Sequence, residues 1–481
     1  MSAPLRIAVV GGGIAGLAAA HAAVRLGRER GQGVQVTLIE RSARLGGNLR
    51  TESAGGFLFD GPDSWVTSKP HATALARDLG LGSSLIETNP RTRRFYIVWS
   101  GRLHPVPEGL VLGVPTRLAP LVLSRLFSLR GKLRMACEPL VPARRFAGEE
   151  DESIASFVRR RLGREAAERL AAPLLGGISS GDPEELSIRA AFPQLVAMER
   201  EHGSLVRGMR AAARARAAAS RGAGASSPAG GGGFLSLSGG LGQLVDALAA
   251  RLEADGVSVR LGTGVRSLER AGSTWRLDLG DGAPLKADRV ALCAPAQVAA
   301  NLLGSIAAGA ARELGTIEHG STTLAFLGYR AADVSHPLDG VGFVAPREPG
   351  RPVVAATWVS SKWAARAPPG HVLLRAFLAN EPGALDDDGA VAAARAGLRD
   401  LMGIEADPVA TRVFRFSRAS PMMRVGHLSL VGRVRAELGR AAPGLILAGG
   451  GYEGVGIPDC IRQGQESMAA LLSLRFDSNG V

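Results

Sequence analysis

The segment Leu5–Gly16, with the sequence LRIAVVGGGIAG, decides the fold of the N-terminal part of the chain. It begins with a short apolar run containing β-branched residues, which predicts a buried strand, and continues into a glycine-rich turn. An alanine-rich stretch to about Gly27 predicts a helix, and Val34–Ile39 has the composition of a second strand. A strand, helix and strand of this length form a right-handed βαβ unit, so we expect a parallel sheet.

The glycine turn has the spacing of a dinucleotide-binding loop. Gly11 permits the tight turn, Gly13 lets the backbone approach a pyrophosphate, and Gly16 allows close packing of helix on strand. Glu40 follows the second strand, where it would accept a hydrogen bond from a ribose hydroxyl. The predicted phosphate-binding residues of this turn are Gly11, Gly12, Gly13, Ile14, Ala15 and Gly16.

Composition limits the remaining function classes. The 481-residue chain is long enough for two or three domains. Its net charge of +13 is carried almost entirely by arginine, and no RNA-binding aromatic signature or helix-turn-helix pattern accompanies it, so we expect no nucleic-acid partner. Cys137, Cys293 and Cys460 are too few and too far apart for a disulfide framework or a CxxC metal site. We therefore expect no metal, a reducing compartment and a cytoplasmic location, without an export signal at the start of the chain.

The residues after the second strand narrow the dinucleotide to FAD. Glu40–Gly47, with the sequence ERSARLGG, resembles the ExxxRxGG extension of the flavin amine oxidase and desaturase superfamily. The C-terminal segment Leu447–Ile457 resembles the glycine-rich helix start that closes the cofactor site in that superfamily. The resemblance implies non-covalent FAD, held by the glycine turn and by Glu40, Arg41, Arg44, Gly46, Gly47, Asn48, Gly61, Pro62, Asp63, Ser64, Val265, Gly450, Val455, Gly456 and Ile457.

The expected fold class is α/β with α+β, comprising a Rossmann-type FAD-binding domain, a mixed-sheet substrate domain and a helical membrane-associating subdomain. The glycine- and serine-rich run at 220–233 cannot bury a core and predicts a flexible linker. The expected divisions are FAD-binding parts at 1–90, 238–303 and 429–475, a helical region at 91–210, a linker at 211–237 and a substrate-binding sheet at 304–428.

The segment 109–135 combines long apolar stretches with five basic residues and no acidic residue. Its charges recur too often for a transmembrane span, but they suit a helix lying among lipid headgroups. A buried helical subdomain with solvated arginines explains the same pattern equally well. The membrane interpretation predicts peripheral contact with an anionic membrane at its cytoplasmic face.

Four further patterns resemble the protoporphyrinogen oxidase family. They are Gly61–Ser64 (GPDS), Glu185–Arg189 (ELSIR) with Phe192-Pro193, Met198–Leu205 (MEREHGSL) and Tyr452–Ile461 (YEGVGIPDCI). The resemblance implies a tetrapyrrole substrate whose methylene carbons lose hydride to FAD in three two-electron steps, with oxygen or a quinone reoxidising the flavin, and it is compatible with a homodimer. We expect protoporphyrinogen IX as the substrate, with coproporphyrinogen III as the alternative.

The same resemblance supplies candidate substrate residues. Arg94 matches the arginine that binds a propionate, and Arg91 or Arg93 could replace it. Asp63 would lie beside the flavin and the substrate, where it either accepts pyrrole N–H groups or caps the following turn. The candidate substrate-binding residues are Asp63, Arg94, Gly177, Leu327, Val359 and Phe377.

Three alternatives share parts of these patterns. Flavin amine oxidases use a lysine near the flavin, and no lysine lies between Ala287 and Ser361. Carotenoid desaturases would lack the ELSIR and MEREH segments. A non-catalytic FAD-bound membrane scaffold is disfavoured by an intact nucleotide site beside an apolar substrate region.

Overall fold

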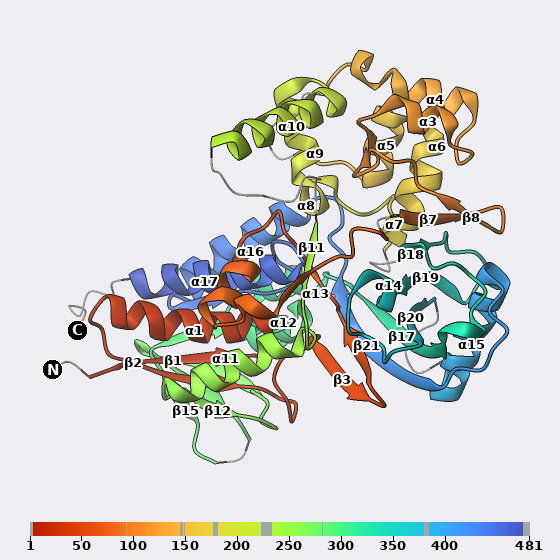
Figure 1. The fold of residues 1–481 in the computed structure, drawn as a ribbon. Coiled ribbons are helices and arrows are strands. Elements are labelled where there is room, and N and C mark those ends of the chain that lie inside the picture. The colour runs from red at the N-terminus through yellow and green to blue at the C-terminus, as the bar shows by residue number, and fades with distance from the viewer. Residues whose placement is uncertain are drawn as a thin grey trace.

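The computed structural model describes residues 3–92, 94–144, 148, 150–176, 181–222, 233–280, 282–379 and 384–474. Figure 1 shows three parts: a nucleotide-binding domain, a domain built on a large mixed sheet, and a helical region above both. The chain passes repeatedly between them, so each of the first two parts contains segments that are distant in the sequence.

Five parallel strands form the central sheet of the nucleotide-binding domain in the order β12-β2-β1-β16-β22. Residues of β1 alternate between two cores, because Ile7 and Val9 pack with one set of helices and Ala8 and Val10 with another. Both faces of the sheet are therefore covered, as a parallel sheet requires. The strands are β1 (Leu5–Val10), β2 (Val34–Ile39), β12 (Ser258–Arg260), β16 (Arg289–Leu292) and β22 (Leu445–Leu447).

One face of this sheet carries α1 and α17, which lie side by side (Figure 1). A Cβ atom at Gly464 of α17 would overlap the backbone of Ala15 in α1, so glycine at residue 464 allows this close contact. The helices on this face are α1 (Ile14–Glu29), α11 (Gly242–Ala254) and α17 (Ile457–Ser473), and those on the other are α12 (Ala296–Leu303), α13 (Ala308–Gly315) and α16 (His427–Ala441). Smaller elements beside them are α2 (His71–Asp78) and the antiparallel strands β13 (Ser267–Ala271), β14 (Thr274–Asp278) and β15 (Leu285–Ala287).

A seven-stranded mixed sheet forms the second domain in the order β21-β17-β20-β19-β18-β7-β8. Neighbouring strands are antiparallel except β18 and β7, which are parallel. One face packs on α15 (Asp387–Met402), and the other faces the nucleotide-binding domain. The strands are β7 (Arg94–Trp99), β8 (Arg102–Pro105), β17 (His319–Arg330), β18 (Gly340–Val344), β19 (Val353–Trp358), β20 (His371–Leu378) and β21 (Ala410–Pro421).

The helical region has a core of its own, which includes a fully buried charge network. Arg161 pairs with Glu138, and the carboxylate of Glu138 accepts hydrogen bonds from Ser204 Oγ at 2.6 Å and Leu205 N at 2.9 Å. Glu138 thus accepts hydrogen bonds from the first backbone amides of α10. Ser204 and Leu205, the last two residues of the MEREHGSL segment, are among its partners. The helices are α3 (Leu118–Leu123), α4 (Leu129–Ala136), α5 (Ile154–Leu162), α6 (Arg164–Ala166), α7 (Ala172–Gly176), α8 (Ile188–Ala191), α9 (Pro193–His202) and α10 (Leu205–Gly222).

Two segments differ from the local structure expected of them. The expected linker at 211–237 begins inside α10, which continues to Gly222, and ends inside the strand β11 (Phe234–Leu237); residues 223–232 lie outside the described residues. The segment 109–135 is not one helix, because β9 (Leu110–Val111) and β10 (Val114–Pro115) precede two short helices there. Gly113, which has a positive φ, turns the chain between these strands. Within the described residues, none of the helices is both long and apolar enough to cross a membrane.

Candidate active site

A cavity of about 1660 Å³ lies between the nucleotide-binding domain, the mixed sheet and the helical region. The ends of β1, β2 and β16 open into it, so it occupies the position where open α/β sheets bind their ligands. Ordinary small-molecule pockets measure roughly 300–1000 Å³, which this cavity exceeds. It therefore has room for a dinucleotide and a second large ligand.

The glycine turn shapes the part of the cavity near α1. Gly11 has a φ of +109°, and a Cβ atom at Gly16 would overlap its carbonyl oxygen. A Cβ atom at Gly13 would instead meet no atom within 4 Å, and Gly13 lines the cavity. The backbone at Gly13 is thus open to a ligand, as expected for a pyrophosphate approach.

Glu40 and the loop after it hold the glycine turn in place. Glu40 Oε2 accepts a hydrogen bond from Gly12 N at 2.7 Å, and Gly46 N donates to Gly12 O at 2.8 Å. Arg44 donates to the carbonyl oxygens of Gly47 and Leu49 at 2.6 and 3.1 Å, so its guanidinium fixes the loop backbone. Burial lowers the pKa of Arg44, and the neighbouring Arg50 adds to that effect.

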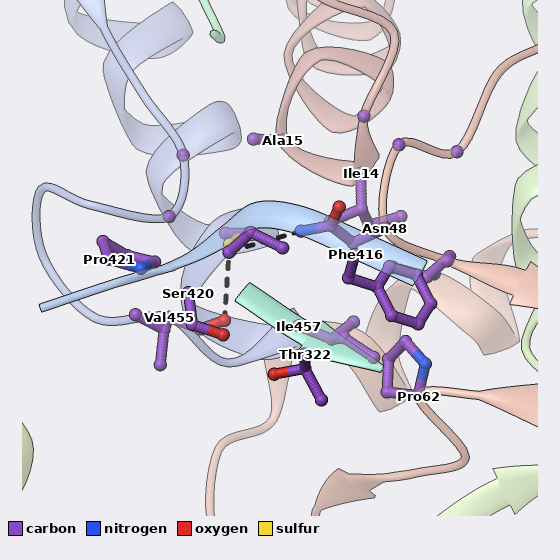
Figure 2. A pocket seen from close by; sticks show the side chains of 18 of the residues that line it. Ile14, Ala15, Asn48, Pro62, Thr322, Phe416, Ser420, Pro421, Val455 and Ile457 are labelled. Carbon is purple, nitrogen blue, oxygen red and sulfur yellow. Dashed lines mark hydrogen bonds between the residues drawn. The ribbon is translucent and has the colours of Figure 1, made fainter. Parts of the chain in front are cut away.

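Figure 2 shows part of the cavity wall, in which Val455 and Ile457 of the C-terminal segment line the same cavity as Asn48 and Pro62. Ile457 is the first residue of α17, so the amide end of a 17-residue helix borders the cavity. Asn48 Nδ2 donates to Ala419 O at 3.3 Å and thereby joins the nucleotide-binding loop to β21 (Figure 2).

Most of the predicted cofactor residues line this one cavity. Gly12, Gly16, Gly61 and Gly456 do not line it. Gly12 and Gly16 lie behind the turn, where a Cβ atom would overlap neighbouring atoms, and Gly456 is the N-cap of α17. The predicted residues that line the cavity are Gly11, Gly13, Ile14, Ala15, Glu40, Arg41, Arg44, Gly46, Gly47, Asn48, Pro62, Asp63, Ser64, Val265, Gly450, Val455 and Ile457.

The predicted substrate residues are dispersed. Asp63 and Phe377 line the cavity, whereas Leu327 and Val359 are buried in hydrophobic cores and do not line it. Leu327 is three residues from the lining residue Leu324 on β17, and an odd offset along a strand places it on the other face, against α15. Gly177 lies outside the described residues.

Arg94 does not line the cavity either. Its side chain is 63% exposed, and Nη1 lies 2.6 Å from Asp339 Oδ2. Phe95, the next residue of β7, does line the cavity, so Arg94 lies on the other face of the strand. Of the two substitutes considered, Arg91 is exposed and Arg93 lies outside the described residues.

Two largely buried cations of the cavity wall, Lys362 and Arg375, were not anticipated from the sequence. Lys362 ends the short helix α14 (Val359–Lys362), one residue beyond the interval 287–361 that contains no lysine. Arg375 lies on β20 at an even offset from Phe377, so both side chains face the cavity. A charged residue inside the apolar run of β20 was the signal for Arg375, because buried arginine requires partners.

Asp63 connects these two cations. Its carboxylate lies 3.2 Å from Lys362 Nζ and 3.4 Å from Arg375 Nη2, and it accepts a hydrogen bond of 2.9 Å from Trp363 Nε1. Burial alone would raise the pKa of Asp63, but Arg375 and Lys362 hold that pKa far below its usual range. Burial lowers the pKa of Lys362, and Asp63 opposes that shift.

The parallel sheet, the open backbone at Gly13 and the space for a second ligand together define a dinucleotide-binding protein that takes a second large ligand. The family model for flavin containing amine oxidoreductases matches residues 14–472. The chain belongs to this family, and FAD is its cofactor.

Individual relatives are similar over nearly the whole chain. Coproporphyrinogen III oxidase of Bacillus subtilis (strain 168) is 36% identical over 98% of this chain and 98% of its own. Chloroplastic protoporphyrinogen oxidase 1 of Arabidopsis thaliana is 30% identical over 95% of this chain and 86% of its own. A solved structure from Exiguobacterium sp. 255-15, provisionally assigned as a protoporphyrinogen oxidase, aligns with a TM-score of 0.83 at 33% identity, covering 98% of this chain and all of that one. The protein is thus similar throughout to oxidases of tetrapyrrole intermediates.

Proposed function

We propose that the protein oxidises coproporphyrinogen III to coproporphyrin III. The observation that carries this proposal is the full-length similarity to a coproporphyrinogen III oxidase, which exceeds the similarity to the plant protoporphyrinogen oxidase. This choice reverses the preference expected from the sequence, where protoporphyrinogen IX was the main substrate and coproporphyrinogen III the alternative. The two substrates share their methylene bridges and differ in the number of propionates, so the reaction at the carbon is the same.

The residues of the cavity suit a flat macrocycle. Phe95, Phe343, Phe377 and Leu324 line its walls and provide apolar surface that excludes water from the reacting carbon. FAD, when bound, supplies the hydride acceptor. The protein's own contribution is to hold FAD with the glycine turn and the start of α17 and to orient the macrocycle against it.

The test is anaerobic mixing of the purified yellow protein with coproporphyrinogen III, protoporphyrinogen IX or an amine, followed by the loss of flavin absorbance. We expect both porphyrinogens to reduce the flavin, with a higher kcat/KM for coproporphyrinogen III, and the amine to leave it oxidised. Aerobic turnover with and without an added quinone then identifies the electron acceptor. Failure of coproporphyrinogen III to bleach the flavin, or a higher kcat/KM for protoporphyrinogen IX, would reject the proposal.

We also propose that the helical region rests on an anionic membrane. An apolar patch, made of residues on α3, α4 and the turn after them, is open to solvent: Leu123 is 83% exposed and Leu129 is 81% exposed. Its other members are Leu118, Val122, Leu133 and Leu140. Of the basic residues within 109–135, Arg117 lies 3.9 Å from Glu108, whereas Arg125 and Arg130 are exposed, and anionic lipid is the partner that their charge favours.

A further inference from the structure

Lys362 and Arg375 carry hydrogen-bond donors in the wall of the cavity that are only partly satisfied by the protein. Arg375 is 5% exposed, and its Nε atom has no hydrogen-bond partner among the described residues. Its Nη1 donates to Asp60 O at 2.8 Å, and Nη2 reaches Thr357 Oγ1 at 3.3 Å. Lys362 Nζ makes long hydrogen bonds of 3.2–3.3 Å to Asp63 and Ser64. It also lies 5.1 Å from the ring centroid of Phe234 and 5.0 Å from that of Trp363, and neither ring is a hydrogen-bond acceptor of carboxylate strength. Because buried polar groups are almost always satisfied, these donors indicate a ligand that carries acceptors.

Asp63 is already fully engaged, so its task is to position the two cations. Its Oδ1 lies within 3.4 Å of Ser64 Oγ, Lys362 Nζ and Arg375 Nη2, and its Oδ2 accepts from Lys362 and Trp363. A carboxylate has about four acceptor positions, and these contacts occupy them. Asp63 therefore fixes the side chains of Lys362 and Arg375 without being free to accept pyrrole N–H groups itself.

The charges of this cluster do not cancel. Asp63 contributes one negative charge against the two positive charges of Lys362 and Arg375. The neighbouring Asp60 is paired with Arg366 at 3.5 Å, so its carboxylate does not supply the missing negative charge. An uncompensated buried cation is costly, and an anionic group of a ligand would offset that cost.

The cluster lies on the surface that the macrocycle would use. The guanidinium of Arg375 lies over the ring of Phe377, 5.0 Å from its centroid. Across the sheet, Thr357 is opposite Arg375 and Ala355 is opposite Phe377, and all four residues line the cavity. A ligand in van der Waals contact with Phe377 therefore has Arg375 at its edge.

We propose that Lys362 and Arg375, held by Asp63, form a subsite that binds one propionate carboxylate of the tetrapyrrole. This inference rests on the proposed function. A planar guanidinium and an ammonium together provide the charge-assisted donors that a carboxylate accepts. The subsite also favours substrates with more propionates, because a neutral substituent there would leave both cations unpaired.

The test compares coproporphyrin III with its tetramethyl ester, in which every carboxylate is neutral. Binding to the FAD-loaded protein is measured by porphyrin fluorescence, for the wild type and for Lys362→Met, Lys362→Arg and Arg375→Lys. Lys286→Met and Arg276→Lys are matched controls on exposed strand residues outside the cavity. FAD content and thermal unfolding are recorded for each variant. If Lys362→Met does not fold, Lys362→Arg and Arg375→Lys still test the subsite, because they keep the positive charge and change only the geometry of the donors.

We expect Lys362→Met to weaken binding of the free acid about tenfold or more, the usual range for a lost charged hydrogen bond, with Lys362→Arg recovering part of the loss. Binding of the ester should hardly change, since it lacks the group that the cations bind. In turnover, KM for coproporphyrinogen III should rise while kcat changes little. Equal losses for acid and ester, or lost FAD with unchanged porphyrin binding, would overturn the subsite. If neither porphyrinogen reduces the flavin of the wild-type protein, the proposed function fails. This result is distinct from the outcomes that would overturn the subsite alone.

Discussion

Gly16 lies so close to the carbonyl oxygen of Gly11 that any side chain at residue 16 would overlap that oxygen. Gly13, three residues earlier, lines the cavity, and a Cβ atom added there would meet no atom within 4 Å. The two glycines therefore serve different purposes: Gly16 permits the packing of α1 on the turn, and Gly13 leaves space for the cofactor.

This difference predicts opposite effects of substitution. Gly13→Val should fold normally and yield colourless protein, because the side chain occupies only the space of the pyrophosphate. Gly16→Ala should lower the free energy of unfolding by about 1–3 kcal/mol or more, as overpacking does. FAD absorbance and urea unfolding of both variants check this. A yellow Gly13→Val protein would show that the pyrophosphate lies elsewhere.

Arg94→Ala tests the propionate anchor expected from the family resemblance. Because Arg94 is exposed and paired with Asp339 on the face away from the cavity, we expect KM for coproporphyrinogen III to stay within about threefold of the wild type, as for other surface ion pairs. Phe377→Ala, which removes a lining side chain, should raise KM further than this. If Arg94→Ala raised KM for coproporphyrinogen III as much as Lys362→Met does, Arg94 would have to be a substrate contact after all.

Replacing two leucines of the apolar patch should strongly weaken lipid binding. Leu123→Asp with Leu129→Asp should weaken binding to phosphatidylglycerol-containing vesicles about a hundredfold, because each buried leucine contributes roughly 1.5–3 kcal/mol. Val409→Asp, at an exposed position outside the helical region, is the control. Vesicle sedimentation measures the difference, and unchanged sedimentation of the double variant would exclude this patch as the lipid contact.

Asp60 should make stability depend on pH. Burial raises its pKa from 3.8 to about 6, against the opposing effects of Thr51 and Arg366. A carboxyl whose pKa is raised by folding stabilises the protein fully below pH 4, and that contribution is lost as the pH rises through 6. Between pH 4 and 7 the wild type should therefore lose about 3 kcal/mol of unfolding free energy relative to Asp60→Asn. Urea unfolding across this range measures it, and parallel curves for the two proteins would contradict the raised pKa.

Local patterns predicted the elements of the nucleotide-binding domain well, because their causes are local. The strand, glycine turn and helix from Leu5 onward need no distant partner to be recognised, and their spacing sets the βαβ geometry. The start of α17 at Ile457 was likewise evident from its glycines. These segments meet at one cavity, as the resemblance implied.

The part of the cavity that would hold the second ligand was harder to predict, because its lining depends on the register of the strands. Leu324 and Leu327 are both apolar, and only their parity along β17 decides which of them faces the cavity. Lys362 and Asp63 are distant in sequence, and only the packing of α14 beside the Gly61–Ser64 segment brings them together. An ion pair of this kind has no periodic signature in the chain.

The segments that form the cavity wall are spread along the sequence, and this affects when FAD can bind during translation. The glycine turn of this wall lies near the start of the chain, its middle part at 263–302, and its closing segment at Gly449–Cys460. A nascent chain on the ribosome therefore exposes the first βαβ unit long before the strand β22 and the helix α17 exist to complete it. Because domains otherwise tend to fold as they emerge, FAD capture here should wait until the segment Gly449–Cys460 has been made, and a truncation before residue 449 should leave the N-terminal fingerprint intact but unable to retain the flavin.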